Sequence, residues 1–319
     1  MNSDIEPDCW ISSYIFFDGN IYSGYCDKFI LEVLVPFLET EEYKHLYKKY
    51  FFIRYSEAGC HIRVRFFGST RILEEELRPL FESIIEQNLK EFITNIKKKY
   101  PEQTIDENLF YIKWVPYEPE LDRYGGEGTI KIAEEFFSFS SVTAIEIIKR
   151  SQENDKSSKL GKALTLMVIM IRKFCNEKEK SAQFISNYSS NYLKAIAKEE
   201  KYHQVWIETF DEGFKRQSGN LIELINDIWE MLDEDGELPE VFYNYSKKIE
   251  LISNELKILF ENNKFIRSGM VLNTWDFVWF SVVPSYIHMM NNRLGVNIQE
   301  ESYLAYLISK AITEGSNVK

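Results

Sequence analysis

The segment from Phe51 to Phe67 constrains the fold of this chain more than any other part of the sequence. It reads FFIRY, then SEAG, then CHIRVRFF, so two runs rich in β-branched and aromatic residues flank a polar turn that contains glycine. This pattern is typical of two antiparallel strands joined by a tight turn. The sequence therefore predicts a β-hairpin in the first part of the chain.

The second strand of this hairpin carries an imidazole and two guanidinium groups. Alternate side chains of a strand share a face, so we expect His61, Arg63 and Arg65 to point one way and the apolar residues between them the other. Arginine on the solvated side of an edge strand is ordinary. Two guanidinium groups beside an imidazole also suit an anion site. From this strand alone, the solvated edge is the favoured interpretation.

The first half of the chain mixes strand and helix signals, and the second half is predicted to be mostly helical. The elements expected around the hairpin are a strand at 10–17, a helix at 22–38 with a kink at Pro36, a helix at 70–99, a short strand at 109–115 and a helix at 130–149. From 160 to 265 we expect helical blocks broken at 218–220 and 233–239.

The most hydrophobic segment, TWDFVWFSVVPSYIHMMNNRLG, predicts a buried helix that is interrupted at Pro284 and ends at Gly295. The sequence contains no internal repeat and no linker that would separate domains. We therefore expect an α+β protein in which a small antiparallel or mixed sheet and a mostly helical second half form a single compact unit over residues 1–319.

Charge and cysteine content exclude several classes of protein. The 38 basic and 50 acidic residues give a net charge of −12, which disfavours direct binding to nucleic acid or anionic lipid. The four cysteines are scattered, without CxxC or Cys/His spacing, so we expect reduced thiols and no metal site. The N-terminal sequence MNSDIEPDCW lacks the features of a signal peptide, and no apolar run of about 18 residues occurs, so a cytoplasmic location is expected.

Two further segments carry groups that could bind or react. The polar loop YEPELDRYGGEG holds Arg123 before Gly125 and Gly126, and a glycine pair lets the backbone approach a neighbouring surface or a ligand closely. The apolar segment SYIHMMNNRLG holds His288 and Arg293. A plain turn and a buried histidine bonded to a backbone carbonyl are the commoner explanations. The residues by themselves thus indicate an α+β protein with a candidate arginine and histidine anion site.

Four segments, in order, resemble the characteristic blocks of one family. They are WISSYIFF with the following helix to VPFL, then YFFIRYSEAGCHIRVRFFG, then YEPELDRYGGEGTIKIAEEFFSFSS, and finally SYIHMMNNRLGV. On these blocks, which run from Trp10 to Val296, the chain resembles the glutamate-elimination domain of lantibiotic and thiopeptide dehydratases. The stretch at about 187–264 looks longer than is usual in that family, and we expect a helical insertion there.

The resemblance implies roles for individual residues. It implies that the arginines of the HIRVR strand contact the glutamyl group, and that Arg123 and His288 also take part in elimination. The residues with an expected substrate-binding role are His61, Glu120, Tyr124 and Arg293. The acidic residues of the polar loop that could bind the α-amino group of the glutamyl moiety are Glu118, Glu120 and Asp122. One position departs from the family, since Ser140 stands before Ser141 where Asp is usual; this affects a secondary contact.

The function implied is a lyase reaction, the removal of glutamate from glutamylated Ser or Thr of a precursor peptide to leave dehydroalanine or dehydrobutyrine. Elimination needs removal of a Cα proton, stabilisation of an enolate-like oxygen and departure of a carboxylate. Arginine suits the anionic groups, and His288 is the candidate for proton transfer because histidine changes charge near neutral pH.

Two alternatives are open at this stage. One is a thiopeptide pyridine synthase, which joins two dehydroalanines in an aza-[4+2] cycloaddition and releases the leader peptide. The other is a non-catalytic subunit that only binds leader peptide. Retention of the arginines and of His288 favours elimination, because a cycloaddition catalyst has no glutamate to bind.

The resemblance also implies partners. The precursor peptide would be bound through its leader and core, and a separate glutamylation subunit would use glutamyl-tRNA. A cyclase or cyclodehydratase is a further candidate partner, and a homodimer is left open. No cofactor is expected.

Overall fold

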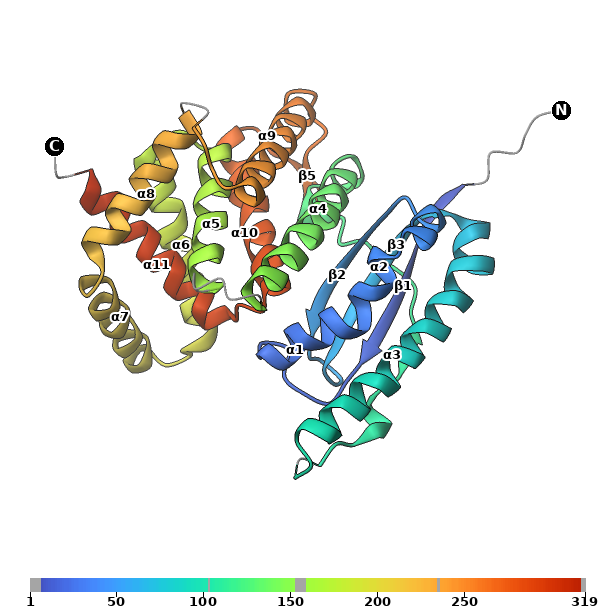
Figure 1. Cartoon of the computed structure of the whole chain (residues 1–319). Helices are drawn as coiled ribbons and strands as arrows, with labels where there is room; N and C mark the ends of the chain where they lie inside the picture. The colour runs from blue at the N-terminus through green and yellow to red at the C-terminus, as the bar shows by residue number, and fades with distance from the viewer. Residues whose placement is uncertain (1–6, 103, 153–158, 234–235, 317–319) are drawn as a thin grey trace. The chain divides into compact units, whose positions relative to one another are not determined.

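The computed structural model describes residues 7–102, 104–152, 159–233 and 236–316 (Figure 1). The chain folds into two compact units that interleave along the sequence: Met1–Pro119 with Phe137–Lys149, and Glu120–Phe136 with Arg150–Lys319. Helix α4, Glu127–Gln152, contributes residues to both units.

The first unit is built on a four-stranded antiparallel sheet in the order β2-β3-β1-β4. The strands are β1 Asp8–Phe16, β2 Lys49–Tyr55, β3 His61–Ser69 and β4 Ile112–Trp114. The predicted hairpin, the flanking strands and the α+β class are confirmed. Since β3 pairs with β1 on one side and β2 on the other, it is an interior strand, and the favoured interpretation of a solvated edge strand is wrong.

Helices cover one face of this sheet (Figure 1). The helical segments are α1 Gly24–Phe29, η1 Ile30–Leu34, α2 Val35–Glu39, η3 Ile72–Leu77 and α3 Arg78–Lys99. The apolar side chains of β3, Ile62, Val64 and Phe66, have no exposed surface. The Phe66 ring packs against Phe37 of α2 and Phe81 of α3, at centroid distances of 6.0 and 5.2 Å. Burying each such side chain stabilises the fold by about 1.5–3 kcal/mol, so this apolar face fixes the orientation of β3.

The expected helix at 22–38 is present, but its irregularity precedes the proline. The chain is helical from Gly24 to Glu39, and residues 30–34 form a wider π-helical turn. Pro36 lies just after this π-helical turn, and its missing N–H removes one backbone hydrogen bond from the continuous helical segment.

The second unit is mostly helical, as predicted. Its elements are α5 Lys159–Phe174, α6 Lys178–Ile196, α7 Glu200–Lys215, α8 Ser218–Asp233, α9 Glu240–Glu261, α10 Trp275–Leu294, α11 Ile298–Gly315 and the short hairpin of β5 Ile266–Arg267 and β6 Met270–Val271. Helices α6 and α11 lie side by side (Figure 1), because Ser189 and Ser302 each donate a hydroxyl proton to the other's backbone carbonyl, at 2.7 and 2.9 Å. Helices α7, α8 and α9 lie within the stretch expected to be an insertion, which stays a prediction.

Of the predicted helix breaks in this unit, the one at 218–220 is present but lies two residues earlier, at Arg216 and Gln217, so that residues 218–220 begin α8. The break predicted at Pro284 is wrong. Helix α10 continues through Pro284, although proline removes a backbone hydrogen bond. Its neighbours Val282 and Val283 are fully buried, and this packing offsets the loss. The predicted stop at Gly295 is confirmed, with a left-handed φ of 74°.

Gly125 is a position where the fold requires glycine. It follows the short helix η5, Asp122–Tyr124, with a φ of +91°, and a Cβ there would lie 2.5 Å from the ring of Phe265. We expect Gly125→Ala to lower the free energy of unfolding by about 2 kcal/mol, from left-handed backbone strain and the ring clash. Urea titration would measure it. Gly219→Ala is the control, since space around that residue is open and alanine should leave stability unchanged or raise it by up to about 1 kcal/mol. Equal stability of the two variants would contradict this account.

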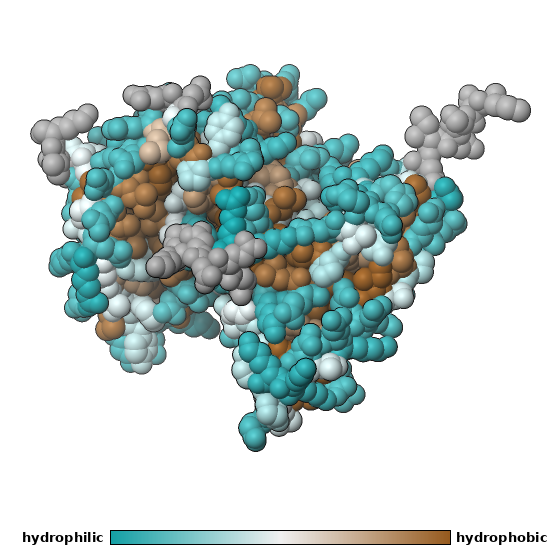
Figure 2. Space-filling view, in the orientation of Figure 1, coloured by the Kyte–Doolittle hydropathy of each residue, from teal (hydrophilic) through white to brown (hydrophobic). Residues whose placement is uncertain are grey.

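Polar side chains cover most of the face shown in Figure 2, and apolar side chains are visible in patches. Among the helices in the described ranges, none is long and apolar enough to cross a membrane.

Candidate active site

The face of the sheet opposite the helices α2 and α3 carries the predicted arginines, and we call it the arginine face. The β3 residues on it are His61, Arg63 and Arg65. Strand register places Tyr14 and Ser12 of β1 directly opposite Arg63 and Arg65. Since residues directly opposite in a sheet share a face, the aromatic and serine side chains of β1 lie beside the guanidinium groups.

Arg63 is held between two tyrosines and an imidazole. Its guanidinium carbon lies 3.4 Å from the ring centroid of Tyr55 and 4.6 Å from that of Tyr14. Its Nε donates a hydrogen bond to Nε2 of His61 at 3.1 Å. These contacts fix the plane of the guanidinium. The bond to His61 uses a single N–H, and the guanidinium carries further donors on its terminal nitrogens.

His61 is buried within this aromatic group. Its ring lies 4.9 Å from the Tyr14 ring and 4.5 Å from the Phe16 ring, and Nδ1 is 2.8 Å from the carbonyl oxygen of Gly59. Because Nε2 accepts from Arg63, Nδ1 must carry the proton and donate to Gly59. Burial lowers the pKa of His61, and the positive charge of Arg63 lowers it further, although the bond to Gly59 acts in the opposite direction. His61 is therefore a neutral support for Arg63.

Arg65 lies between aromatic rings further along the strand. Its guanidinium carbon is 4.8 Å from the ring centroid of Tyr117 and 5.1 Å from that of Phe51. Both rings belong to the same cluster as Trp10, whose ring is 5.0 Å from Phe51. The arginine face is thus rich in both aromatic and positively charged groups, an arrangement suited to binding an anion.

Arg123 occupies η5 in the second unit, where helix α10 fixes its side chain. Its Nε donates to the hydroxyl of Ser285 on α10 at 3.0 Å, and Nη1 forms an ion pair with Glu120 at 3.0 Å. Burial acts to lower the pKa of Arg123, but the surrounding acidic groups, including Glu120 and Tyr192, raise it overall. The guanidinium stays charged.

His288 lies one helical turn from Ser285 on α10, so both side chains share a face. Its Nδ1 is 3.1 Å from each carboxylate oxygen of Glu301 on α11. Glu301 also accepts a hydrogen bond of 2.7 Å from the hydroxyl of Tyr188 on α6. The Tyr192 ring is 5.8 Å from the imidazole, and burial raises the pKa of Tyr192 to about 12. We call Arg123, Ser285, His288, Glu301, Tyr188 and Tyr192 the histidine cluster.

Other predicted residues do not join these two groups. Tyr124 is 2% exposed and stacks on Tyr286, and Arg293 has no exposed surface and donates to the carbonyl oxygen of Met289 at 2.6 Å. Burial leaves neither side chain a surface for a ligand. Asp122 accepts hydrogen bonds from Ser268 in the turn between β5 and β6, so its carboxylate links η5 to this hairpin.

Ser140 and Ser141 of α4 are buried, and both hydroxyls donate to the carbonyl oxygen of Phe137. The Ser141 hydroxyl also accepts from the backbone N–H of Phe52 at 3.0 Å, which ties α4 to β2. The serine pair therefore has a structural contact within the first unit.

Sequence reasoning missed Ser285, Tyr188 and Glu301. Helix α11 was not predicted, although the capping box of Asn297 and Glu300 marks its start. Glu301 shares the buried stripe of α11 with Ala305 and Ile308, and a carboxylate on an apolar stripe is the signal that could have identified it.

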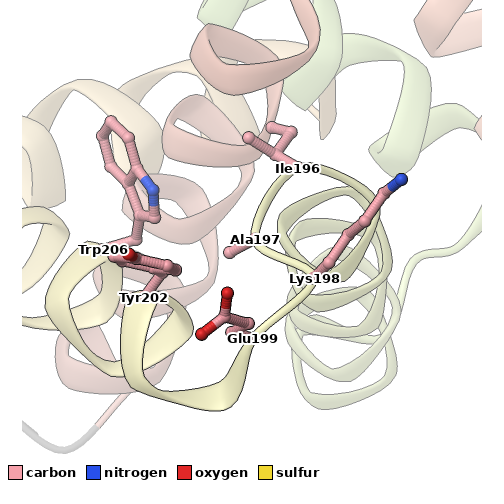
Figure 3. Close-up of a pocket in the computed structure, with 6 residues that line it drawn as sticks. All are labelled: Ile196, Ala197, Lys198, Glu199, Tyr202 and Trp206. Carbon is pink, nitrogen blue, oxygen red and sulfur yellow. The ribbon is translucent and has the colours of Figure 1, made fainter.

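A separate pocket of about 330 Å³ lies where α6 ends and α7 begins (Figure 3). Its lining residues are Ile196, Ala197, Lys198, Glu199, Tyr202 and Trp206. It holds none of the predicted catalytic residues. Within the described parts of the chain, no three His, Cys, Asp or Glu side chains are grouped as metal ligands would be.

Residues 10–312 match the family model for the C-terminal region of lantibiotic biosynthesis dehydratases. The chain therefore belongs to this family. It is 23% identical over 302 residues to the epidermin biosynthesis protein EpiB of Staphylococcus epidermidis. That alignment covers 94% of this chain and 26% of EpiB, so the chain spans about a quarter of the length of this relative.

Two solved structures share the fold. The pyridine synthase TbtD from thiomuracin biosynthesis superimposes with a TM-score of 0.75 at 14% identity, over 97% of this chain and 99% of TbtD. The tRNA-dependent lantibiotic dehydratase MibB from Microbispora sp. 107891 superimposes with a TM-score of 0.62 at 17% identity, over 97% of this chain and 28% of MibB. At these identities the likeness establishes a common fold alone.

Proposed function

We propose that this chain eliminates glutamate from Ser or Thr residues that carry it as an ester in a precursor peptide, leaving dehydroalanine or dehydrobutyrine. The proposal rests on the surroundings of His288. Its Nδ1 is bound by the buried carboxylate of Glu301, and His288 lies one helical turn from Ser285, which binds Arg123. An oriented imidazole and a fixed guanidinium are the groups that proton removal and stabilisation of an enolate-like oxygen require. Membership of the dehydratase family supports this reaction.

Each polar group then has a role. Arg63 and Arg65 bind the glutamate carboxylate and stabilise the leaving group, and His61 keeps Arg63 in position. Arg123 stabilises the negative charge that develops on the substrate, and exposed Glu120 is the acidic candidate for the substrate's α-amino group. His288 removes the Cα proton. Tyr124 and Arg293, being buried, are given packing roles instead of substrate contacts.

An elimination domain cannot make its own substrate, so a glutamylating partner must supply the ester. We propose that this partner uses glutamyl-tRNA and that this chain binds only the modified peptide. The net charge of −12 agrees with tRNA binding by the partner.

The test is incubation of the purified protein with a precursor peptide that is already glutamylated on Ser. We expect the peptide to lose one glutamic acid in mass and to react with an added thiol, because dehydroalanine is an electrophile. Hydrolysis of the ester would also release glutamate but would return Ser, which does not react with the thiol. Hydrolysis or unchanged ester would overturn the proposal.

The fold shared with TbtD favours a second candidate, an aza-[4+2] cycloaddition of two dehydroalanines. Conversion of a bis-dehydroalanine peptide to a pyridine, with no action on the glutamyl ester, would establish it instead. Binding of leader peptide without either reaction would indicate a non-catalytic subunit.

A further inference from the structure

Glu301 and Tyr188 contact His288 or its partner, yet no step of the proposed reaction uses them. We propose that they are positioning residues: the Glu301 carboxylate, fixed by the Tyr188 phenol, holds the His288 imidazole with its proton on Nδ1, so that Nε2 accepts the substrate proton. The inference rests on the elimination proposed above. It specifies that Nε2 of His288 takes the substrate proton and that the Glu301 carboxylate selects this nitrogen.

The geometry determines the direction of each hydrogen bond. Nδ1 of His288 is 3.1 Å from both oxygens of Glu301, so the carboxylate faces this nitrogen and not Nε2. The hydroxyl of Tyr188 is 2.7 Å from Oε2, and a phenol that keeps its proton donates to a carboxylate. Glu301 thus accepts from both neighbours. A carboxylate that accepts at Nδ1 requires the proton there and leaves Nε2 with a lone pair.

Burial makes this arrangement selective. The Glu301 side chain is fully buried and Tyr188 is 3% exposed, while the His288 side chain is 24% exposed. Water therefore cannot replace the carboxylate as the partner of Nδ1, and the exposed part of the ring is what a substrate can reach. An unpaired carboxylate at such a site would be costly, so its two donors hold it in one place.

Titratable and charged groups of α6, α10, α11 and the short helix η5 act on this carboxylate directly or through Tyr192. They are Glu300 on α11, His288 on α10, Tyr188 and Tyr192 on α6, and Arg123 of η5, which acts on Tyr192. Burial raises the pKa of Glu301, and the hydrogen bonds from His288 and Tyr188 act in the opposite direction. Burial raises the pKa of Tyr188 well above its usual value, which keeps its hydroxyl proton available for donation.

The Nε2 lone pair takes the Cα proton, the electrons of the Cα–H bond form the Cα=Cβ double bond, and the Cβ–O bond breaks with its electron pair leaving on the glutamate carboxylate. His288 becomes an imidazolium, and the charge of Glu301 stabilises it as it forms. No oxidant or further reactant is required.

The first measurement is the ¹⁵N spectrum of the histidine rings in the 319-residue chain at mildly alkaline pH, with His288→Gln used to assign the His288 signals. We expect a protonated Nδ1 and an unprotonated Nε2. In Glu301→Gln the side chain keeps its size but can donate to Nδ1 as well as accept from it, so the two tautomers should become mixed. Glu314→Gln, an exposed position on the same helix, is the control and should leave the spectrum unchanged.

The second measurement is the kinetics of glutamate elimination. Glu301→Gln should lower kcat by about 10²- to 10⁴-fold with little effect on KM, and Tyr188→Phe should lower it by less, because the carboxylate stays in place. In a His288→Gln background, Glu301→Gln should cause no further loss, since a residue that acts only through His288 has nothing left to position. A purely structural role for Glu301 would instead give additive losses and a lower unfolding temperature.

The two readouts separate failure of this inference from failure of the proposed function. A wild-type protein that eliminates glutamate but shows mixed tautomers, or a Glu301→Gln variant with unchanged tautomer and kcat, overturns the positioning role. If the protein shows the expected tautomer but leaves the glutamyl ester intact, Glu301 still holds the His288 imidazole as proposed, and the elimination function is refuted.

Discussion

Replacing His288 by alanine is expected to lower kcat for glutamate elimination by about 10²- to 10⁴-fold, the range that a positioned general base contributes. The loss should fall on kcat more than on KM, because proton removal belongs to the chemical step. Alanine also removes a donor to the buried carboxyl of Glu301, which adds a structural cost. His288→Gln separates the two effects, since its amide keeps an N–H donor and lacks a base.

Single-turnover reactions on a glutamylated peptide, followed by mass spectrometry, would measure this effect. His45→Ala is the matched control, because His45 is exposed on the short helix η2, Glu41–Leu46, of the first unit and has no role in the proposed reaction. Its kcat should equal that of the wild type. Wild-type kcat in His288→Gln would show that another group removes the proton.

Arg63→Lys is expected to lower kcat/KM for the same reaction by about 10²-fold, the loss typical when one donor to a developing anion is removed. Lysine keeps the positive charge but lacks the planar guanidinium that stacks on Tyr55 at 3.4 Å. It also lacks the Nε–H that His61 accepts at 3.1 Å. Bidentate binding of a carboxylate should therefore be lost while the charge of the arginine face is unchanged.

The change in stability should be small. A cation–π contact at a partly exposed site contributes about 0.5–1 kcal/mol, so urea unfolding of Arg63→Lys should shift by no more than this. Arg71→Lys is the control in the same unit, since the Arg71 side chain is 53% exposed and lies 3.7–3.8 Å from Glu75 and Glu76. It should eliminate glutamate at the wild-type rate. Undiminished kcat/KM in Arg63→Lys would remove Arg63 from the proposed site.

The β3 strand illustrates how far local sequence carries a prediction. Its alternation of apolar and basic residues correctly placed Ile62, Val64 and Phe66 on the buried face, because strand periodicity depends only on neighbouring residues. The choice between an edge and an interior strand was wrong. Pairing of β3 with β1 depends on a segment far away in the sequence, and no pattern within β3 reports it.

Helix α10 shows that tertiary packing can override a local rule, here the rule that proline ends a helix. Pro284 indicates a break, and in isolation it would weaken the helix by about 3 kcal/mol. The structure keeps the helix continuous because apolar side chains on several sides of it are buried, among them Val283 and Tyr286. Continuity matters for the proposed reaction, since it places Ser285 and His288 on one face.

The sequence alone determined the α+β class, the hairpin, the helical second half and the face of β3 that carries the basic side chains, because hydrophobic periodicity is a property of consecutive residues. Only the tertiary structure decided that Tyr188, which lies 113 residues before Glu301, meets it at 2.7 Å and that Glu301 in turn binds His288. Burial of apolar surface is non-directional and tolerates many arrangements. Hydrogen bonds require atoms to approach within about 3 Å, so these contacts follow from how the helices pack and not from any one helix.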